Sequence, residues 1–127
     1  MGCFMAVIAT DRGYDPIALG TATETVVVDG NRRKYVQLGR TLRFYGGTTS
    51  ATEVGCNLRC KFCFSDKPVW KPKQTGQFYT PQEVFDGLAA NARKHGHKTI
   101  SASASEGTLG RQHLHELLDL VEGSEFV

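Results

Sequence analysis

The second half of the chain alternates between helix and strand patterns, and this alternation constrains the fold more than any other feature. The Thr-Pro-Gln-Glu segment at 80–83 combines an N-cap hydroxyl, a proline at the first helical position and a glutamate that completes a capping box. Apolar residues at helical spacing follow, and Gly96 supplies a left-handed stop. These signals predict a helix from about Pro81 to His95.

Strand patterns lie on both sides of this helix. Thr48 to Val54 is a Thr-rich segment that follows two glycines, and Lys98 to Ser105 alternates apolar residues with serines. After a loop at Glu106 to Gly110, leucines at helical spacing predict a second helix that ends near Gly123. This order predicts a parallel sheet with right-handed crossovers, whose ligand sites lie at the carboxyl ends of the strands.

The first part of the chain has the composition of strands. Its β-branched and aromatic residues gather in three segments, which are Phe4 to Ala9, Leu19 to Val28 and Lys34 to Tyr45. We therefore expect a small β-rich N-terminal extension over residues 1–45, ahead of an α/β unit over residues 46–127.

Charge and hydropathy argue against two classes of partner. Fifteen lysines and arginines against thirteen aspartates and glutamates leave a net charge of +2, which gives no field that favours nucleic acid or an anionic membrane. No stretch approaches the ~20 apolar residues that a bilayer span requires, and the first ten residues lack the basic start of a leader peptide. We expect a cytoplasmic protein that binds neither nucleic acid nor membrane.

Three of the four cysteines fall in one short segment, spaced as C-x3-C-x2-C at Cys56, Cys60 and Cys63. Three thiols in one loop cannot all pair with one another, which argues against a disulfide framework and for metal or cluster ligation. A structural zinc or iron–sulfur site needs four protein donors, whereas three donors leave one coordination position open for substrate. The spacing therefore indicates a reactive metal centre with one vacant position.

This cysteine spacing resembles that of the radical S-adenosylmethionine (radical SAM) superfamily, in particular its archaeal and bacterial activating-enzyme-like members. That family has an aromatic residue before the last cysteine, which is Phe62 here. The resemblance implies a 4Fe-4S cluster on Cys56, Cys60 and Cys63, with S-adenosylmethionine on the fourth iron. It also implies an external electron donor such as ferredoxin or flavodoxin, and a 5'-deoxyadenosyl radical that abstracts hydrogen from an unknown small-molecule or protein substrate.

The resemblance extends past the cysteines, over about Gly46 to Val127. Residues 76–84 are similar to the start of the family's first barrel helix. Residues 104–110, Ala-Ser-Glu-Gly-Thr-Leu-Gly, are similar to the family's G-G-E-P-T-L-G loop, which contacts the amino group of S-adenosylmethionine. The residues that the resemblance assigns to the cofactor are Phe62, Ser105, Glu106 and Thr108. It assigns no catalytic residue.

The resemblance also implies a fold, the N-terminal part of a partial (β/α) TIM-like barrel with parallel strands. Residues 46–127 would then be a truncated radical SAM core with the first two of about six βα units, and this fragment alone is expected to be inactive. Ala104 and Ser105 stand where the family has glycines. The alternative hypothesis is therefore a non-enzymatic iron–sulfur-binding fragment without a complete cofactor pocket. A zinc-binding module is a third.

Other polar clusters are interpreted as solvent-exposed. His95 with His97 and His113 with His115 look like chelating pairs, but His113 and His115 lie about 200 degrees apart around a helix and cannot share a metal. Both pairs are predicted to face solvent. The same holds for the basic run at 32–34, Arg-Arg-Lys, which we interpret as part of an exposed turn.

Overall fold

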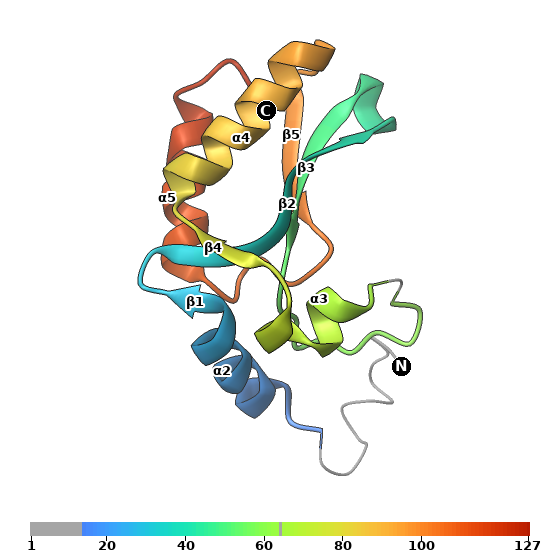
Figure 1. Cartoon of the computed structure of the whole chain (residues 1–127), viewed down its shortest axis with the longest axis vertical. Helices are drawn as coiled ribbons and strands as arrows, with labels where there is room; N and C mark the ends of the chain where they lie inside the picture. Colours follow the sequence, from blue (N-terminus) through green and yellow to red (C-terminus); the bar gives the residue numbers. More distant parts are fainter. Residues whose placement is uncertain (1–13, 64) are drawn as a thin grey trace.

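The computed structural model describes residues 14–63 and 65–127, and in this part of the chain five strands form one sheet (Figure 1). The strands are β1 (Val28–Asp29), β2 (Arg32–Leu42), β3 (Thr48–Glu53), β4 (Gln77–Tyr79) and β5 (Thr99–Ser103). The helices are α2 (Pro16–Val27), α3 (Lys67–Trp70), α4 (Pro81–His95) and α5 (Arg111–Glu122), with 3-10 turns at Phe44–Gly46 and Pro72–Gln74. None of these described helices is long and apolar enough to cross a bilayer. The predicted strand at Phe4 to Ala9 lies outside the described residues.

The predicted helix at Pro81 to His95 is confirmed as α4. The Thr80 hydroxyl accepts a hydrogen bond from the Glu83 amide at 3.1 Å, and the Glu83 carboxylate accepts one from the Thr80 amide at 2.8 Å. Gly96 follows the last turn in the left-handed conformation, with φ of 70°. Both ends of the helix therefore depend on the local signals visible in the sequence.

Helices α4 and α5 lie side by side against one face of the sheet (Figure 1). The buried apolar residues between them and the sheet are Tyr35, Ala51, Val84, Leu88, Ala89, Ala92, Ile100, Leu117 and Phe126. Helix α4 connects β3 to β5, which pair in parallel with Ala51 opposite Ala102. The carboxyl ends of these two strands therefore meet at one edge of the sheet, which positions the loops that follow them.

The predicted parallel TIM-like barrel is wrong, because the sheet is mixed and mostly antiparallel. Strand β2 pairs antiparallel with β1, β3 and β4, and β3 with β5 is the parallel pair among the described strands. Only residues 43–47 connect β2 to β3, and strands joined by so short a connection pair antiparallel. Strand β2, from the first part of the chain, belongs to the same sheet as β3 and β5.

The strand predicted at Leu19 to Val28 is also wrong, since these residues form most of helix α2. The Asp15 carboxylate caps this helix by accepting hydrogen bonds from the amides of Ile17 at 3.0 Å and Ala18 at 3.2 Å. Pro16 occupies the first turn. The helix-start signal therefore outweighs the β-propensity of the threonines and valines that follow.

Candidate functional site

The cysteine loop begins directly after β3, at Gly55. Gly55 has φ of 101°, and a Cβ there would lie 2.9 Å from Val27 Cγ1 of α2. The Gly55 amide also donates to the Pro68 carbonyl at 2.8 Å, across the base of the loop. A residue with a side chain would disturb both the conformation and the close approach of α2. Gly55 therefore determines where the loop that carries Cys56 begins after β3.

The three predicted ligands line one cavity of about 220 Å³. Predicted site residues Phe62 and Ser105 line it too, and its wall also includes Leu58, Ser65, Val69 and Ala104. The cysteines come from the loop after β3, whereas Ala104 and Ser105 come from the loop after β5. The parallel pairing of β3 with β5 thus brings two segments together that lie some forty residues apart in the sequence.

The three cysteines differ in their surroundings. Cys56 is only 8% exposed, and its Sγ accepts a hydrogen bond from the Leu58 amide at 3.4 Å. Cys63 is half-buried, and its Sγ lies 3.9 Å from the Ser65 carbonyl oxygen. Cys56 and Cys63 are free thiols, whereas Cys60 takes part in a disulfide bond. The described residues contain no preformed group of three metal ligands. Because Cys60 is disulfide-bonded, that bond must be reduced before the loop can offer three thiolates.

The loop after β5 is hydrogen-bonded to both ends of the cysteine segment. The Ser65 hydroxyl donates to the Ala104 carbonyl at 2.8 Å, and the Ser105 hydroxyl donates to the Glu53 carbonyl at 2.8 Å. Ala104 has φ of 78°, the left-handed region that glycine adopts freely and that costs an alanine roughly 1 kcal/mol. The chain therefore holds an alanine in a glycine-like conformation against the cavity.

Glu106 lies beside the cysteine loop, but its carboxylate is not part of the cavity wall. The Glu106 amide donates to the Gly55 carbonyl at 3.2 Å, which brings the backbone of this loop to the base of the cysteine loop. The carboxylate accepts hydrogen bonds from the Thr108 amide at 3.2 Å and from the Thr108 hydroxyl. Phe62, by contrast, lines the cavity while its side chain remains 81% exposed. The structure thus places Ser105 and Phe62 at the cavity, and Glu106 and Thr108 outside its wall.

A buried arginine, Arg33, joins the two loops, and no pattern in the sequence predicted it. Arg33, predicted to face solvent, has an exposed fraction of 0%, and Lys34 in the same run is buried as well. The Arg33 guanidinium donates to four backbone carbonyls, those of Val54 at 3.0 Å, Gly55 at 3.2 Å, Glu106 at 3.0 Å and Gly107 at 3.3 Å. One cation therefore holds the start of the cysteine loop and the loop after β5 in a fixed relation.

A chain of buried polar side chains continues from Arg33. Its guanidinium lies 3.7 Å from the Glu53 carboxylate, and the Tyr35 hydroxyl lies 3.4 Å from that carboxylate and 2.8 Å from His113 Nε2. His113, predicted to face solvent, is 1% exposed, with Nδ1 2.8 Å from the Asn31 carbonyl. A carbonyl only accepts, so His113 Nδ1 carries the proton of the hydrogen bond to Asn31.

Burial governs the protonation of this chain. It raises the pKa of Glu53, and the nearby Arg33 guanidinium offsets only part of that effect. It likewise raises the pKa of the Tyr35 hydroxyl, with a further contribution from the charge of Glu53. Burial lowers the pKa of His113 below its usual 6.5, against the hydrogen bond to Asn31. These shifts favour the neutral forms of Glu53, Tyr35 and His113.

The stabilisation contributed by His113 is expected to decrease as the pH falls below 6.5. The folded chain binds the His113 proton less readily than the unfolded chain, so protons favour unfolding between the folded pKa and 6.5. Urea unfolding of the wild type and His113→Gln between about pH 5 and pH 7 measures this. The difference in unfolding free energy between the two should shrink at the lower pH. His115→Gln, on the exposed side of the same helix, is the matched control. A difference that stays constant on acidification contradicts the prediction.

Comparison with known proteins identified no relative of this chain. No protein-family model matches it, and neither do any curated proteins or solved structures. The functional interpretation therefore depends on the residues of the cavity and their geometry.

Proposed function

We propose that the chain binds a 4Fe-4S cluster through Cys56, Cys60 and Cys63 and uses it to cleave S-adenosylmethionine reductively. The observation that carries this proposal is the shared cavity, which all three cysteines line together with two residues of the loop after β5. Thiolates are the ligands that iron–sulfur clusters prefer, and three of them leave one iron open to a small ligand. The C-x3-C-x2-C spacing and Phe62 before the last cysteine add the resemblance to radical SAM proteins.

The surroundings of the cysteines fit such a group. Cys56 is nearly excluded from water and accepts a hydrogen bond from the Leu58 amide, and hydrogen bonds to sulfur and burial both tune the potential of a cluster. The glycine-like backbone of Ala104 lies at the cavity, where radical SAM proteins have a glycine-rich loop next to the cofactor. Ser105 would then stand next to the bound S-adenosylmethionine.

When bound, the cluster would supply one electron to cleave a carbon–sulfur bond of S-adenosylmethionine, giving methionine and a 5'-deoxyadenosyl radical. A ferredoxin- or flavodoxin-like donor would provide that electron, and the radical would take a hydrogen atom from the substrate. The chain itself would bind and orient. Cys56, Cys60 and Cys63 would hold the irons, and Ala104 with Ser105 would limit the space beside them. Arg33 would keep the two loops at a fixed separation through its four carbonyl contacts.

The test is anaerobic reconstitution of the full chain with iron and sulfide after thiol reduction, followed by dithionite and S-adenosylmethionine. We expect 5'-deoxyadenosine and methionine in equal amounts, and none from Cys63→Ser treated in the same way. A reduced cluster that yields no 5'-deoxyadenosine overturns the enzymatic part of the proposal. Zinc without iron after anaerobic purification overturns the cluster itself.

One observation favours a second candidate, a non-enzymatic cluster-binding protein. The Glu106 carboxylate, which the resemblance assigns to the amino group of S-adenosylmethionine, is hydrogen-bonded to Thr108 and does not line the cavity. A chain with this arrangement would bind a cluster but would offer no carboxylate to the amino group of S-adenosylmethionine. Equilibrium dialysis of the reconstituted chain with S-adenosylmethionine separates the two candidates, because only the first retains the ligand.

A further inference from the structure

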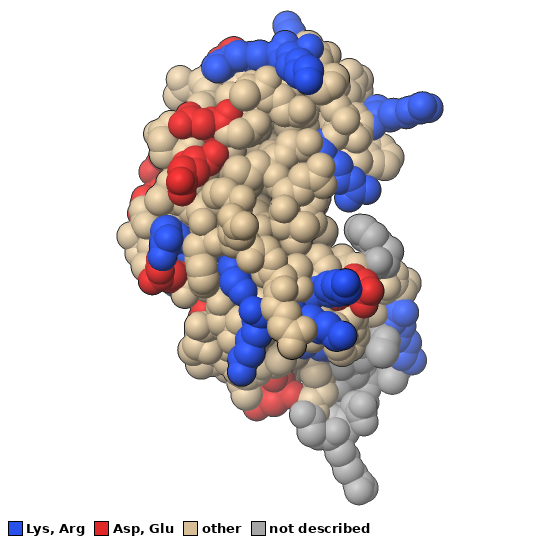
Figure 2. All heavy atoms as spheres, in the orientation of Figure 1, with Lys and Arg blue, Asp and Glu red and all other residues tan. Residues whose placement is uncertain are grey.

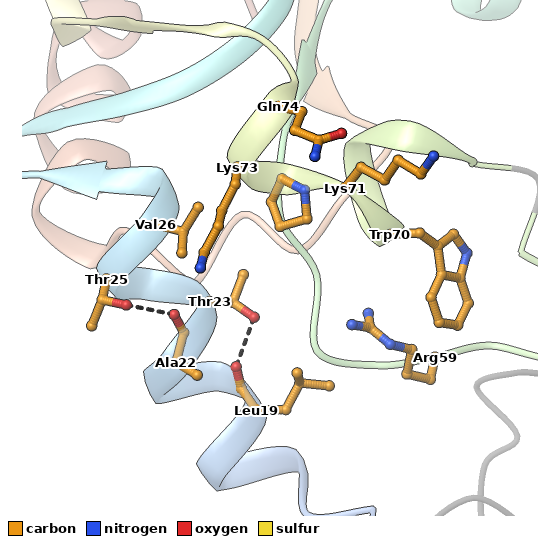
Figure 3. A pocket seen from close by; sticks show the side chains of 11 residues that line it. Leu19, Ala22, Thr23, Thr25, Val26, Arg59, Trp70, Lys71, Lys73 and Gln74 are labelled. Carbon is orange, nitrogen blue, oxygen red and sulfur yellow. Dashed lines mark hydrogen bonds between the residues drawn. The ribbon is translucent and has the colours of Figure 1, made fainter.

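A second and larger cavity lies next to the cysteine loop, which contributes Arg59 to its lining. Its volume is about 580 Å³, within the range of ~300 to 1,000 Å³ that small-molecule pockets occupy. Helix α2 forms one wall, and residues 70–74, from the end of α3 through the following 3-10 turn, form the other (Figure 3). Arg59, between two of the predicted cluster ligands, closes the end of the cavity.

The charged side chains that line this cavity are all cations. Arg59, Lys71 and Lys73 belong to its lining, and no carboxylate does. The ion pairs within residues 14–63 and 65–127 involve other side chains, Arg32 with Asp29, Arg33 with Glu53 and Arg93 with Glu125. Figure 2 shows several lysines and arginines on the lower half of the molecule, where α3 lies. The lining of the cavity therefore carries three cations and no carboxylate.

A buried lysine adds to this charge from behind the wall. The Lys34 ammonium donates to the carbonyls of Pro72 at 2.8 Å and Lys73 at 3.2 Å, which ties the 3-10 turn to β2. Lys34 is buried, so its charge is poorly screened by solvent. It therefore both fixes the backbone that carries Lys73 and favours an anion in the cavity.

One of these cations, Arg59, is held in a fixed orientation. The Arg59 guanidinium is held by its hydrogen bond to the Cys56 carbonyl at 2.7 Å and by stacking 4.5 Å from the centre of the Trp70 ring. Figure 3 shows it pointing into the opening between α2 and Trp70, while Lys73 extends toward α2 and Lys71 points away. A guanidinium pre-oriented in this way can bind a phosphate or carboxylate through two parallel hydrogen bonds.

The two threonine hydroxyl groups in the wall already donate hydrogen bonds within α2, so the cations are the groups that would bind an anion. Thr23 donates to the Leu19 carbonyl at 2.7 Å and Thr25 to the Ala22 carbonyl at 2.7 Å, both within α2 (Figure 3). The remaining α2 side chains in the wall are apolar, namely Leu19, Ala22 and Val26. A ligand that fills the cavity thus meets positive charge on one side and an apolar helix face on the other.

We propose that this cavity binds an organic phosphate or carboxylate with an apolar body, whose anionic group lies between Arg59 and Lys73 and whose apolar part lies on α2. The site is separate from the cysteine cavity and is complete without a cluster. It shares only Arg59 with the cysteine loop. Binding can therefore be measured on the metal-free chain, and a negative result leaves the cluster proposal untouched.

The probe is n-octyl phosphate below its micellar concentration, titrated by calorimetry into the full chain. Inorganic phosphate and neutral octyl glucoside are the comparison ligands. We expect octyl phosphate to bind at least about tenfold more tightly than either, since the cavity contributes one charge-assisted interaction and one apolar surface. Equal binding of octyl glucoside, or of inorganic phosphate, overturns the proposal.

The variants Arg59→Gln and Lys73→Gln should each weaken octyl phosphate binding by about tenfold. Lys94→Gln, an exposed residue of α4 far along the chain, removes the same charge and is the matched control. Arg59→Gln also removes the contact to the Cys56 carbonyl and can disturb the cysteine loop. The Lys73 side chain makes no hydrogen bond to the described residues. Lys73→Gln is therefore the variant that tests binding without disturbing that loop. Identical affinities for Lys73→Gln and Lys94→Gln contradict the proposal.

Discussion

Replacement of Arg33 by methionine is expected to lower the free energy of unfolding by about 3–5 kcal/mol. The substitution keeps an unbranched apolar stem but removes the donors to four backbone carbonyls of the two loops. It also leaves the buried Glu53 carboxyl without its cation. Buried polar groups without partners carry their full desolvation cost, which is why the effect is large. Urea unfolding followed by circular dichroism measures it.

Arg32→Met is the matched control, because Arg32 precedes Arg33 in the same strand and pairs with Asp29 at the surface. Removing that exposed ion pair should cost no more than about 1 kcal/mol. If Arg33→Met does not fold, the double variant Arg33→Met/Glu53→Gln serves instead, since it removes both members of the buried pair. It should recover stability relative to Arg33→Met alone. A loss for Arg33→Met similar to that for Arg32→Met shows that the carbonyl contacts contribute little.

Serine at any one of Cys56, Cys60 or Cys63 is expected to reduce the iron bound after anaerobic reconstitution by more than about tenfold. The physical reason is that each thiolate would bind one iron of the cluster, and two thiolates in one loop do not hold a 4Fe-4S group. Iron and sulfide analysis, with the electron paramagnetic resonance signal of the reduced cluster, measures the loss. Loss of even second-shell partners already costs a metal site ~10- to 100-fold in affinity.

Cys3→Ser is the thiol control for this series, because Cys3 stands outside the C-x3-C-x2-C segment. It should bind as much iron as the wild type once the chain is reduced. Far-ultraviolet circular dichroism of the metal-free variants separates lost ligation from lost folding. A Cys60→Ser chain that keeps its full iron content shows that Cys60 is not a ligand and refutes the three-cysteine site.

Local signals predicted those parts of the fold that local interactions determine. Helix α4 was predicted with correct bounds because its capping box and its terminal glycine lie within the helix's own sequence. The start of α2 has the same kind of signal, an aspartate before a proline, but the Thr- and Val-rich segment after Asp15 was interpreted as a strand. Capping hydrogen bonds at 3.0 and 3.2 Å decided this segment in favour of helix.

The antiparallel part of the sheet depends on pairing between distant residues and could not be predicted in this way. Strand β2 carries a plain strand pattern that is equally compatible with a parallel or an antiparallel partner. The structure shows its partners: Tyr35 of β2 pairs with Glu53 of β3 on one side and with Gln77 of β4 on the other. The barrel predicted from the resemblance is therefore wrong because the local sequence does not indicate in which direction β2 pairs with its neighbours.

The same register explains why Arg33 was missed. A run of three basic residues is usually solvated, and nothing within the run distinguishes its middle member. The usable signal lay in β3, where Glu53 is a lone carboxylate at the end of a strand of small residues. A carboxyl group in such a strand needs a buried partner, and Arg33 is that partner. The cysteine spacing thus indicated a site at this loop, but nothing in it indicated the buried pair of Arg33 and Glu53.

The clamp formed by Arg33 determines how a molecule can reach the sulfur atoms. Because one guanidinium grips the backbone of both loops from below, neither loop can swing aside without breaking contacts that the other also needs. On the solvent side of the cavity, Phe62 contributes an exposed ring to the wall. The two loops thus share one buried anchor, while the aromatic side chain of Phe62 remains exposed in the cavity wall.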